Sequence, residues 1–87
     1  MLVMTQAAAG YLSNVLDNSE APQELAVRLM VDDEGLTAVI DEERPGDTIF
    51  HHDGRKVLLL DDHASEALTA RTLDLRPTED GERLGLK

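Results

Sequence analysis

The strongest constraint on the fold of this chain is a stretch in which apolar side chains recur at every second residue, over residues 24–31 and again over residues 36–41. A period of two is typical of β-strands with one buried face. The separating residues are acidic or include glycine and proline, which favours tight turns between neighbouring strands. The pattern therefore predicts strands over residues 24–31 and 36–41. Residues 47–52 and 55–60 are predicted as two further strands because they flank a two-residue turn.

The turn between the last two of these strands is Asp53-Gly54. This dipeptide is a strong hairpin signal because both turn positions adopt positive φ. A two-residue hairpin at this point places Phe50 opposite Val57. It places Ile49 opposite Leu58 in the same way. We therefore expect an antiparallel pair of strands held by apolar cross-strand contacts.

A helix precedes the strands, because the apolar residues there follow a period near 3.6. Thr5 is placed to cap the N-terminus of this helix, which we expect to end at Asp17. Its apolar stripe consists of Ala8, Tyr11, Leu12, Val15 and Leu16. After the strands, Asp62 is placed to cap a second, short helix that continues to Thr69.

The C-terminal residues predict two further strands. Residues 72–76 alternate in hydrophobicity, residues 77–81 are typical of a turn, and Leu84 and Leu86 indicate a last strand. The order of elements predicts a single domain over residues 1–87, of class α+β. Its mixed sheets should be mainly antiparallel, with one longer N-terminal helix and one short helix.

The charge of the chain excludes several kinds of partner. Eight Lys and Arg stand against 18 Asp and Glu, which gives a net charge of −10. A nucleic-acid binder needs a basic face, so we expect no nucleic-acid partner. Anionic membrane surfaces are disfavoured for the same reason, and no apolar run approaches the ~20 residues of a membrane span. The first residues lack the basic region of a signal peptide, so we expect a cytoplasmic protein.

Five short motifs follow one another along the chain. They are Met4–Ala8 at the start of the first helix, Leu25–Leu29 in the next strand, Arg44–Phe50, the Asp53-Gly54 turn running into Val57–Asp61, and Thr72–Leu75. In order and spacing they resemble the HesB/IscA-like family of iron–sulfur cluster assembly proteins, the A-type carriers. The resemblance implies a barrel-like HesB/IscA-type domain and a role linked to iron–sulfur cluster assembly.

The chain departs from that family where the carriers bind their cargo. The carriers hold iron or a cluster on a cysteine in a Gly-rich loop after the second strand, and on a Cys-Gly-Cys motif near the C-terminus. These 87 residues contain no cysteine, and the corresponding loop is Asp32-Asp33-Glu34-Gly35. Clusters need soft thiolate ligands, and carboxylates are hard ones. We therefore expect a cysteine-less relative that binds no cofactor.

Three histidines are the candidates for a metal site. His51, His52 and His63 lie near aspartates, and two His with a carboxylate would suit Fe(II) or Zn²⁺. However, adjacent residues of a strand point to opposite faces, so His51 and His52 cannot chelate one ion unless the strand is bulged. His63 lies near a helix start, where exposed polar residues are common. We expect these side chains to be solvated rather than metal-bound.

The acidic clusters Asp32-Asp33-Glu34 and Asp41-Glu42-Glu43 are the remaining candidates for chemistry. They lack the spacing of a calcium loop. A catalytic carboxylate needs desolvation or a close partner, which turn tips rarely provide, so we expect solvated turns. No serine lies in a Gly-x-Ser-x-Gly setting, so we expect no enzyme. Asp32, Asp33 and Glu34 remain a candidate docking site for a basic protein partner.

Two functions stay open at this point. One is a non-enzymatic, cysteine-less relative of the A-type carriers, acting as an accessory or partner-binding protein in iron–sulfur cluster assembly. The other is a small acidic homodimeric interaction domain that is unconnected with iron. A weak His/Asp metal binder is a third alternative.

Overall fold

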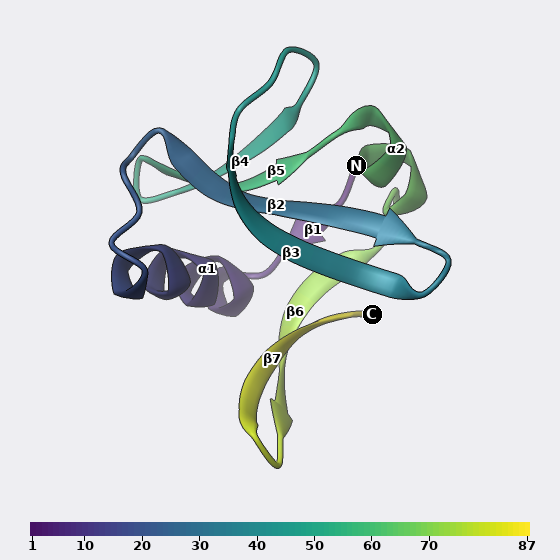
Figure 1. Cartoon of the computed structure of the whole chain (residues 1–87). Coiled ribbons are helices and arrows are strands. Elements are labelled where there is room, and N and C mark those ends of the chain that lie inside the picture. The colour runs from purple at the N-terminus through teal and green to yellow at the C-terminus, as the bar shows by residue number, and fades with distance from the viewer.

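The computed structural model describes all of residues 1–87 and contains seven strands and two helices (Figure 1). In chain order they are β1 (Val3–Met4), α1 (Gln6–Asn18), β2 (Leu25–Asp32), β3 (Gly35–Glu42), β4 (Thr48–His52), β5 (Arg55–Leu60), α2 (Asp62–Ala67), β6 (Thr72–Thr78) and β7 (Gly81–Leu86). Helices and sheet are combined as the α+β prediction required. Neither helix is long and apolar enough to cross a membrane.

The strands form two separate mixed sheets. The four-stranded sheet has the order β3-β2-β5-β4, and the three-stranded sheet has the order β1-β6-β7. The hairpins β2–β3, β4–β5 and β6–β7 are antiparallel, while β2 pairs with β5 and β1 with β6 in parallel. Each sheet keeps open edges, so the expected barrel-like closure is not present. The β6–β7 hairpin extends away from the larger sheet (Figure 1).

Helix α1 begins where the sequence predicted. The Thr5 hydroxyl accepts a hydrogen bond from the Ala8 amide at 3.1 Å, which satisfies one free amide of the first turn. The same hydroxyl donates to Asp74 Oδ1 at 2.9 Å, so the cap also ties the helix to β6. The helix buries one side, formed by Ala8, Ala9, Leu12 and Leu16. Tyr11 and Val15, at the margin of the stripe, are only half-buried.

The core is built from aliphatic side chains of both helices and both sheets. Twelve buried residues form one cluster: Leu2, Ala8, Leu12, Leu16, Val27, Leu29, Val57, Leu58, Leu60, Ala64, Leu68 and Leu73. Burying a Leu or Val side chain contributes about 1.5–3 kcal/mol, so this cluster is the main source of stability. It fixes α1 and α2 against the larger sheet and joins both sheets through Leu73 of β6.

The predicted register of the β4–β5 hairpin was wrong by one residue. Phe50 pairs with Leu58 and not with Val57, and Ile49 accordingly pairs with Leu59. A register shift between Phe50 and His51 is the cause, because it leaves Val57 as an extra residue on β5. Turn chemistry sets the register only up to such a bulge. Beyond it every cross-strand pair moves by one position.

Two other boundaries also differ from expectation. The cap of α2 is Asp61, whose Oδ1 accepts from the Ala64 amide at 2.8 Å, while Asp62 lies in the first turn. The expected turn over residues 77–81 is shorter, because Pro77 belongs to β6. Proline is tolerated there because β1 pairs only with the start of β6, so no neighbouring strand requires the missing amide on that side.

Candidate interaction surface

The three histidines do not converge on one point. His51 is exposed and His52 half-buried on β4, while His63 is exposed in α2. His52 Nε2 lies 3.5 Å from the Asp53 carboxylate, its own neighbour in the turn. The bulge in this hairpin adds its extra residue to β5 and not to β4, so it does not bring His51 and His52 together. No group of three or more His, Asp or Glu side chains is arranged to hold a metal ion.

The acidic turn between β2 and β3 is exposed at the tip of its hairpin. Asp32 Oδ1 accepts a hydrogen bond from the Glu34 amide at 2.8 Å, a local turn that stabilises the loop. Gly35 follows at φ +127°, a conformation that side-chain-bearing residues rarely adopt. Asp33 and Glu34 are exposed and form no ion pair. The three acidic side chains are therefore accessible to a partner.

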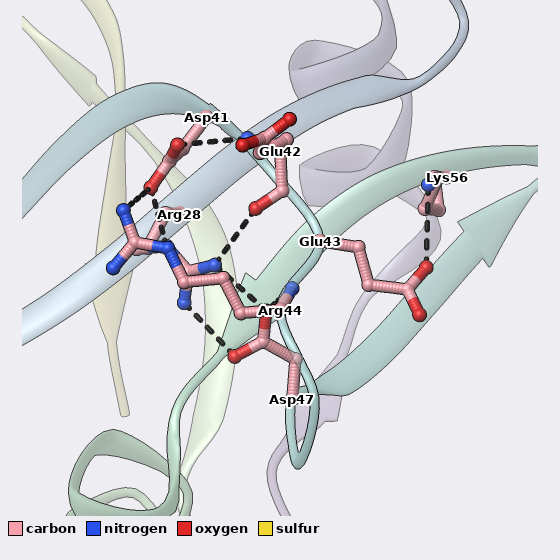
Figure 2. A network of polar contacts seen from close by, with 7 residues as sticks. All are labelled: Arg28, Asp41, Glu42, Glu43, Arg44, Asp47 and Lys56. Carbon is pink, nitrogen blue, oxygen red and sulfur yellow. Dashed lines mark hydrogen bonds and ion pairs between the residues drawn. The ribbon is translucent and has the colours of Figure 1, made fainter.

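One member of the second acidic cluster, Asp41, is held in a charge network and is not a solvated turn residue, which corrects the sequence-based expectation for Asp41, while Glu42 and Glu43 are exposed. The network is centred on Arg28 of β2, a residue that is only 4% exposed (Figure 2). Arg28 Nη1 and Nη2 donate to the two carboxylate oxygens of Asp47 at 3.0 and 2.7 Å. Arg28 Nε donates to Asp41 Oδ2 at 2.9 Å, and Nη2 also donates to the Glu42 carbonyl at 3.0 Å. Four hydrogen bonds thus satisfy the buried cation.

The β3–β4 connection is held in place by this network. Arg44-Pro45-Gly46-Asp47 forms a turn in which the Asp47 amide donates to the Arg44 carbonyl at 3.1 Å and Gly46 has φ +88°. The Arg44 amide donates to Asp47 Oδ2 at 2.7 Å. Glu43, next in the connection, lies 3.3 Å from Lys56 Nζ (Figure 2). The connection is therefore fixed to β2 and β5 by charge pairs.

The carboxylates of this network are locked in their ionised form. The hydrogen bond from Arg28 holds the pKa of Asp47 below its usual range. The Glu42 amide and then Arg28 lower the pKa of Asp41. The bidentate Asp47 in turn raises the pKa of Arg28. Elsewhere, Lys87 is the main cause that lowers the pKa of Asp74 to about 2.

Sequence reasoning missed this network because Arg28 looked like an ordinary outward-facing residue of an alternating strand. The available signal was its position between Val27 and Leu29, in the middle of a strand whose two neighbours in the sheet were also predicted. An arginine in a central strand needs carboxylate partners. Its two carboxylate partners are Asp41, in the adjacent strand β3, and Asp47, in the connection between β3 and β4.

Strand β3 carries three of the five large apolar side chains that are exposed in the structure. Leu36, Val39 and Ile40 are 37%, 41% and 39% exposed. The strand lies at one edge of the four-stranded sheet and pairs with β2 alone. Together with the acidic turn that precedes it, β3 forms the β3 surface, defined as residues 32–42. This surface is the strongest candidate for an interaction site.

No family model matches this sequence, and no curated protein matches it either. Solved structures do. The crystal structure of SufA from Escherichia coli, involved in biosynthesis of iron–sulfur clusters, matches with a TM-score of 0.78 and 24% identity, covering 99% of this chain and 83% of SufA. The crystal structure of IscA with the [2Fe-2S] cluster matches with a TM-score of 0.68 and 16% identity, covering 100% of this chain and 84% of IscA.

A solution structure of a protein from Aquifex aeolicus matches at a TM-score of 0.67 and 17% identity, covering 99% of this chain and 89% of that protein. At these identities the matches show the fold. The chain has the IscA/HesB-like A-type fold that its motifs resembled.

The residues of this chain do not fit an iron–sulfur cluster. Protein-bound clusters are held in the ordinary case by four cysteine thiolates, and none of the 87 residues is a cysteine. The loop after β2 offers carboxylates, which are hard ligands, and one Asp32 oxygen already accepts from Glu34. The fold is thus present without the ligand chemistry.

Proposed function

We propose that this chain is a non-enzymatic, cysteine-less relative of the A-type carriers that acts through a protein partner in iron–sulfur cluster assembly, in the cytoplasm. The observation that carries the proposal is the match to SufA over 99% of the chain at a TM-score of 0.78. SufA is involved in biosynthesis of iron–sulfur clusters, and the IscA structure holds a [2Fe-2S] cluster. The absence of thiolates in this chain favours partner binding over cluster carriage.

The state of the carboxylates supports a non-enzymatic role. General acid catalysis needs a carboxyl whose pKa is raised toward the working pH. The clearly perturbed carboxyls of this chain, Asp41, Asp47 and Asp74, are all shifted in the opposite direction by cations and amide donors. They are ionised near neutral pH and committed to structural hydrogen bonds.

The acidic turn is the proposed docking site for a basic partner. Asp32, Asp33 and Glu34 are exposed at one end of the β2–β3 hairpin, in a chain of net charge −10. Charge complementarity of this kind accelerates association. The attraction between the two proteins falls as salt rises, because exposed charges are screened over about 8 Å at physiological ionic strength.

Affinity purification from the native host tests the proposal. We expect proteins that build or use iron–sulfur clusters to co-purify with the chain. The triple variant Asp32→Asn, Asp33→Asn, Glu34→Gln should bind the recovered partner more weakly and with less salt dependence. Asn at position 32 keeps the oxygen that accepts from the Glu34 amide, so the turn is preserved.

The matched control is the triple variant Glu79→Gln, Asp80→Asn, Glu82→Gln. It removes the same charge from the β6–β7 hairpin, where these three side chains are also exposed. We expect partner affinity close to that of the unmodified chain. If both triple variants lowered the affinity for the partner equally, the net charge of the chain and not the acidic turn would be responsible for binding. Recovery of partners unrelated to iron–sulfur proteins would contradict the proposed role.

Anaerobic reconstitution with iron and sulfide tests the part of the proposal that concerns cargo. We expect a colourless protein without visible absorbance, since no thiolate is present to hold a cluster. A stable brown species at stoichiometric iron would show ligation by histidine or carboxylate and would overturn it.

A further inference from the structure

Strand β3 presents a free hydrogen-bonding edge. It pairs with β2 in an unbroken antiparallel register that closes at Asp32 and Gly35 around a two-residue turn. In such a hairpin the closing pair is hydrogen-bonded, and bonded and non-bonded pairs then alternate along the strands. The backbone N–H and C=O groups of Leu36, Ala38 and Ile40 consequently face away from β2, toward the open edge.

This edge lacks the usual protection of edge strands. Proteins blunt such edges with short strands, lysine, proline or bulges. The opposite edge of the same sheet, β4, has five residues and a register shift. In contrast, β3 has eight residues, Gly35–Glu42, with no lysine, no proline and no register shift. Its exposed Leu36, Val39 and Ile40 would contribute apolar contacts to an added strand.

Both ends of β3 are acidic. Asp33 and Glu34 precede the strand and Glu42 ends it, and none of these three carboxylates is in an ion pair. Arg28 and Arg44 are already paired with Asp41. An occupant of the edge therefore meets uncompensated negative charge at both ends of an apolar centre.

This charge pattern disfavours a second copy of the same chain as the occupant. A two-fold antiparallel pairing centred on Ala38 would set Leu36 opposite Ile40 of the other copy. The same register would set Glu34 opposite Glu42 at each end. Like charges directly opposite in neighbouring strands are destabilising, and both copies carry a net charge of −10.

We propose that the outer edge of β3 binds an extended segment of a protein partner that has alternating apolar residues at its centre and Lys or Arg at both ends. Main-chain hydrogen bonds to Leu36, Ala38 and Ile40 supply affinity, as in other cases of strand addition. The acidic ends of β3 select the basic ends of the segment. The inference rests on the proposed partner-binding role and specifies the chemistry of the segment that is recognised.

The test uses the whole chain and two synthetic peptides. The probe is Lys-Lys-Thr-Val-Thr-Val-Thr-Lys-Lys, and the control has Glu in place of every Lys. Fluorescence anisotropy measures affinity, and amide correlation NMR locates the site. We expect the Lys peptide to bind with shifts concentrated on residues 36–40 and an affinity that falls as salt rises, while the Glu peptide does not bind.

Two pairs of variants sharpen this result. Ala38→Pro removes a backbone N–H that faces the open edge and is not bonded to β2. It should lower the affinity for the Lys peptide by ~10-fold or more. Ala38→Val keeps this N–H and should keep the affinity. Glu34→Gln with Glu42→Gln should weaken binding and flatten its salt dependence. Glu79→Gln with Glu82→Gln, on the β6–β7 hairpin, should change neither.

The inference is overturned if the Lys peptide does not bind, if its shifts lie elsewhere, or if Ala38→Pro binds as tightly as Ala38→Val. A dimer in sedimentation experiments that Ala38→Pro abolishes would overturn it in favour of a second copy. None of these outcomes bears on the link to iron–sulfur assembly, which depends on the partners recovered from the host. Conversely, partners from another process would leave the peptide result intact.

Discussion

The two arms of the β2–β3 hairpin have the same length and opposite environments. Each strand has eight residues and an alternating sequence. In β2, residues 26–29 are all buried, and the set includes the charged Arg28. In β3, three large apolar side chains are more than a third exposed. The hairpin thus buries a charge in one arm and exposes apolar surface in the other.

The difference shows that neighbours, and not the pattern of a strand, decide its burial. Strand β2 lies between β3 and β5, and Asp47 of the connection after β3 accepts two hydrogen bonds from its Arg28 (Figure 2). Strand β3 has a neighbour on one side only. The charge network of β2 is therefore structural, while the uncovered edge of β3 is available for function. Three predictions test this division.

Removing the buried cation should have the largest effect. Arg28→Met leaves Asp47, whose side chain is 3% exposed, without the guanidinium that neutralises it. Breaking a buried pair by removing one partner costs about 3–5 kcal/mol, and we expect a loss of this size in the free energy of unfolding measured with urea. Arg44→Met, at a 65% exposed side chain, is the control and should cost less than about 1 kcal/mol.

A pair of identical substitutions compares the two arms directly. Leu29→Ala, at a residue 2% exposed in β2, should lower the free energy of unfolding by about 2–5 kcal/mol. Leu36→Ala, at a residue 37% exposed in β3, should lower it by less than about 1 kcal/mol. The measurement is chemical denaturation of both variants under the same conditions. Similar losses would mean that β3 is covered in solution.

Acid should weaken the fold through carboxyls with lowered pKa. The pKa values of Asp41, Asp47 and Asp74 lie below the ordinary 3.8 in the folded state, for Asp74 at about 2. A carboxyl with a depressed folded-state pKa stabilises the fold above its unfolded-state pKa, and this contribution is lost as pH falls through the folded-state value. Their contribution should therefore be level near neutral pH and decline from about pH 4 to about pH 2.

The variant Asp74→Asn isolates one of these groups. It removes the carboxylate that lies 2.6 Å from Lys87 Nζ and accepts from the Thr5 hydroxyl. We expect a shallower decline of the free energy of unfolding with acid, followed by circular dichroism. The effect should be the smallest of the three, because the side chain of its partner Lys87 is 63% exposed. An unchanged slope would assign the acid sensitivity to the other two carboxyls.

Local chemistry predicted most of the secondary structure. The Thr5 cap, the apolar stripe of α1 and the turn residues at Asp53-Gly54 act over a few residues, so their effects can be inferred from neighbours in the chain. The order of motifs was also sufficient to indicate the IscA/HesB-like fold, which the similarity to SufA confirmed. Exposure of Asp33 and Glu34 followed from their place in a tight turn.

What the sequence determined by itself is therefore the elements, their order and the absence of thiolate ligands, since each depends on residue type and short-range spacing. The tertiary structure decided which strands are covered. It placed Arg28 between two strands, brought Asp47 to it from the β3–β4 connection, shifted the β4–β5 register at Val57 and left the edge of β3 open. These outcomes depend on contacts between residues distant in sequence, which a period of two does not specify.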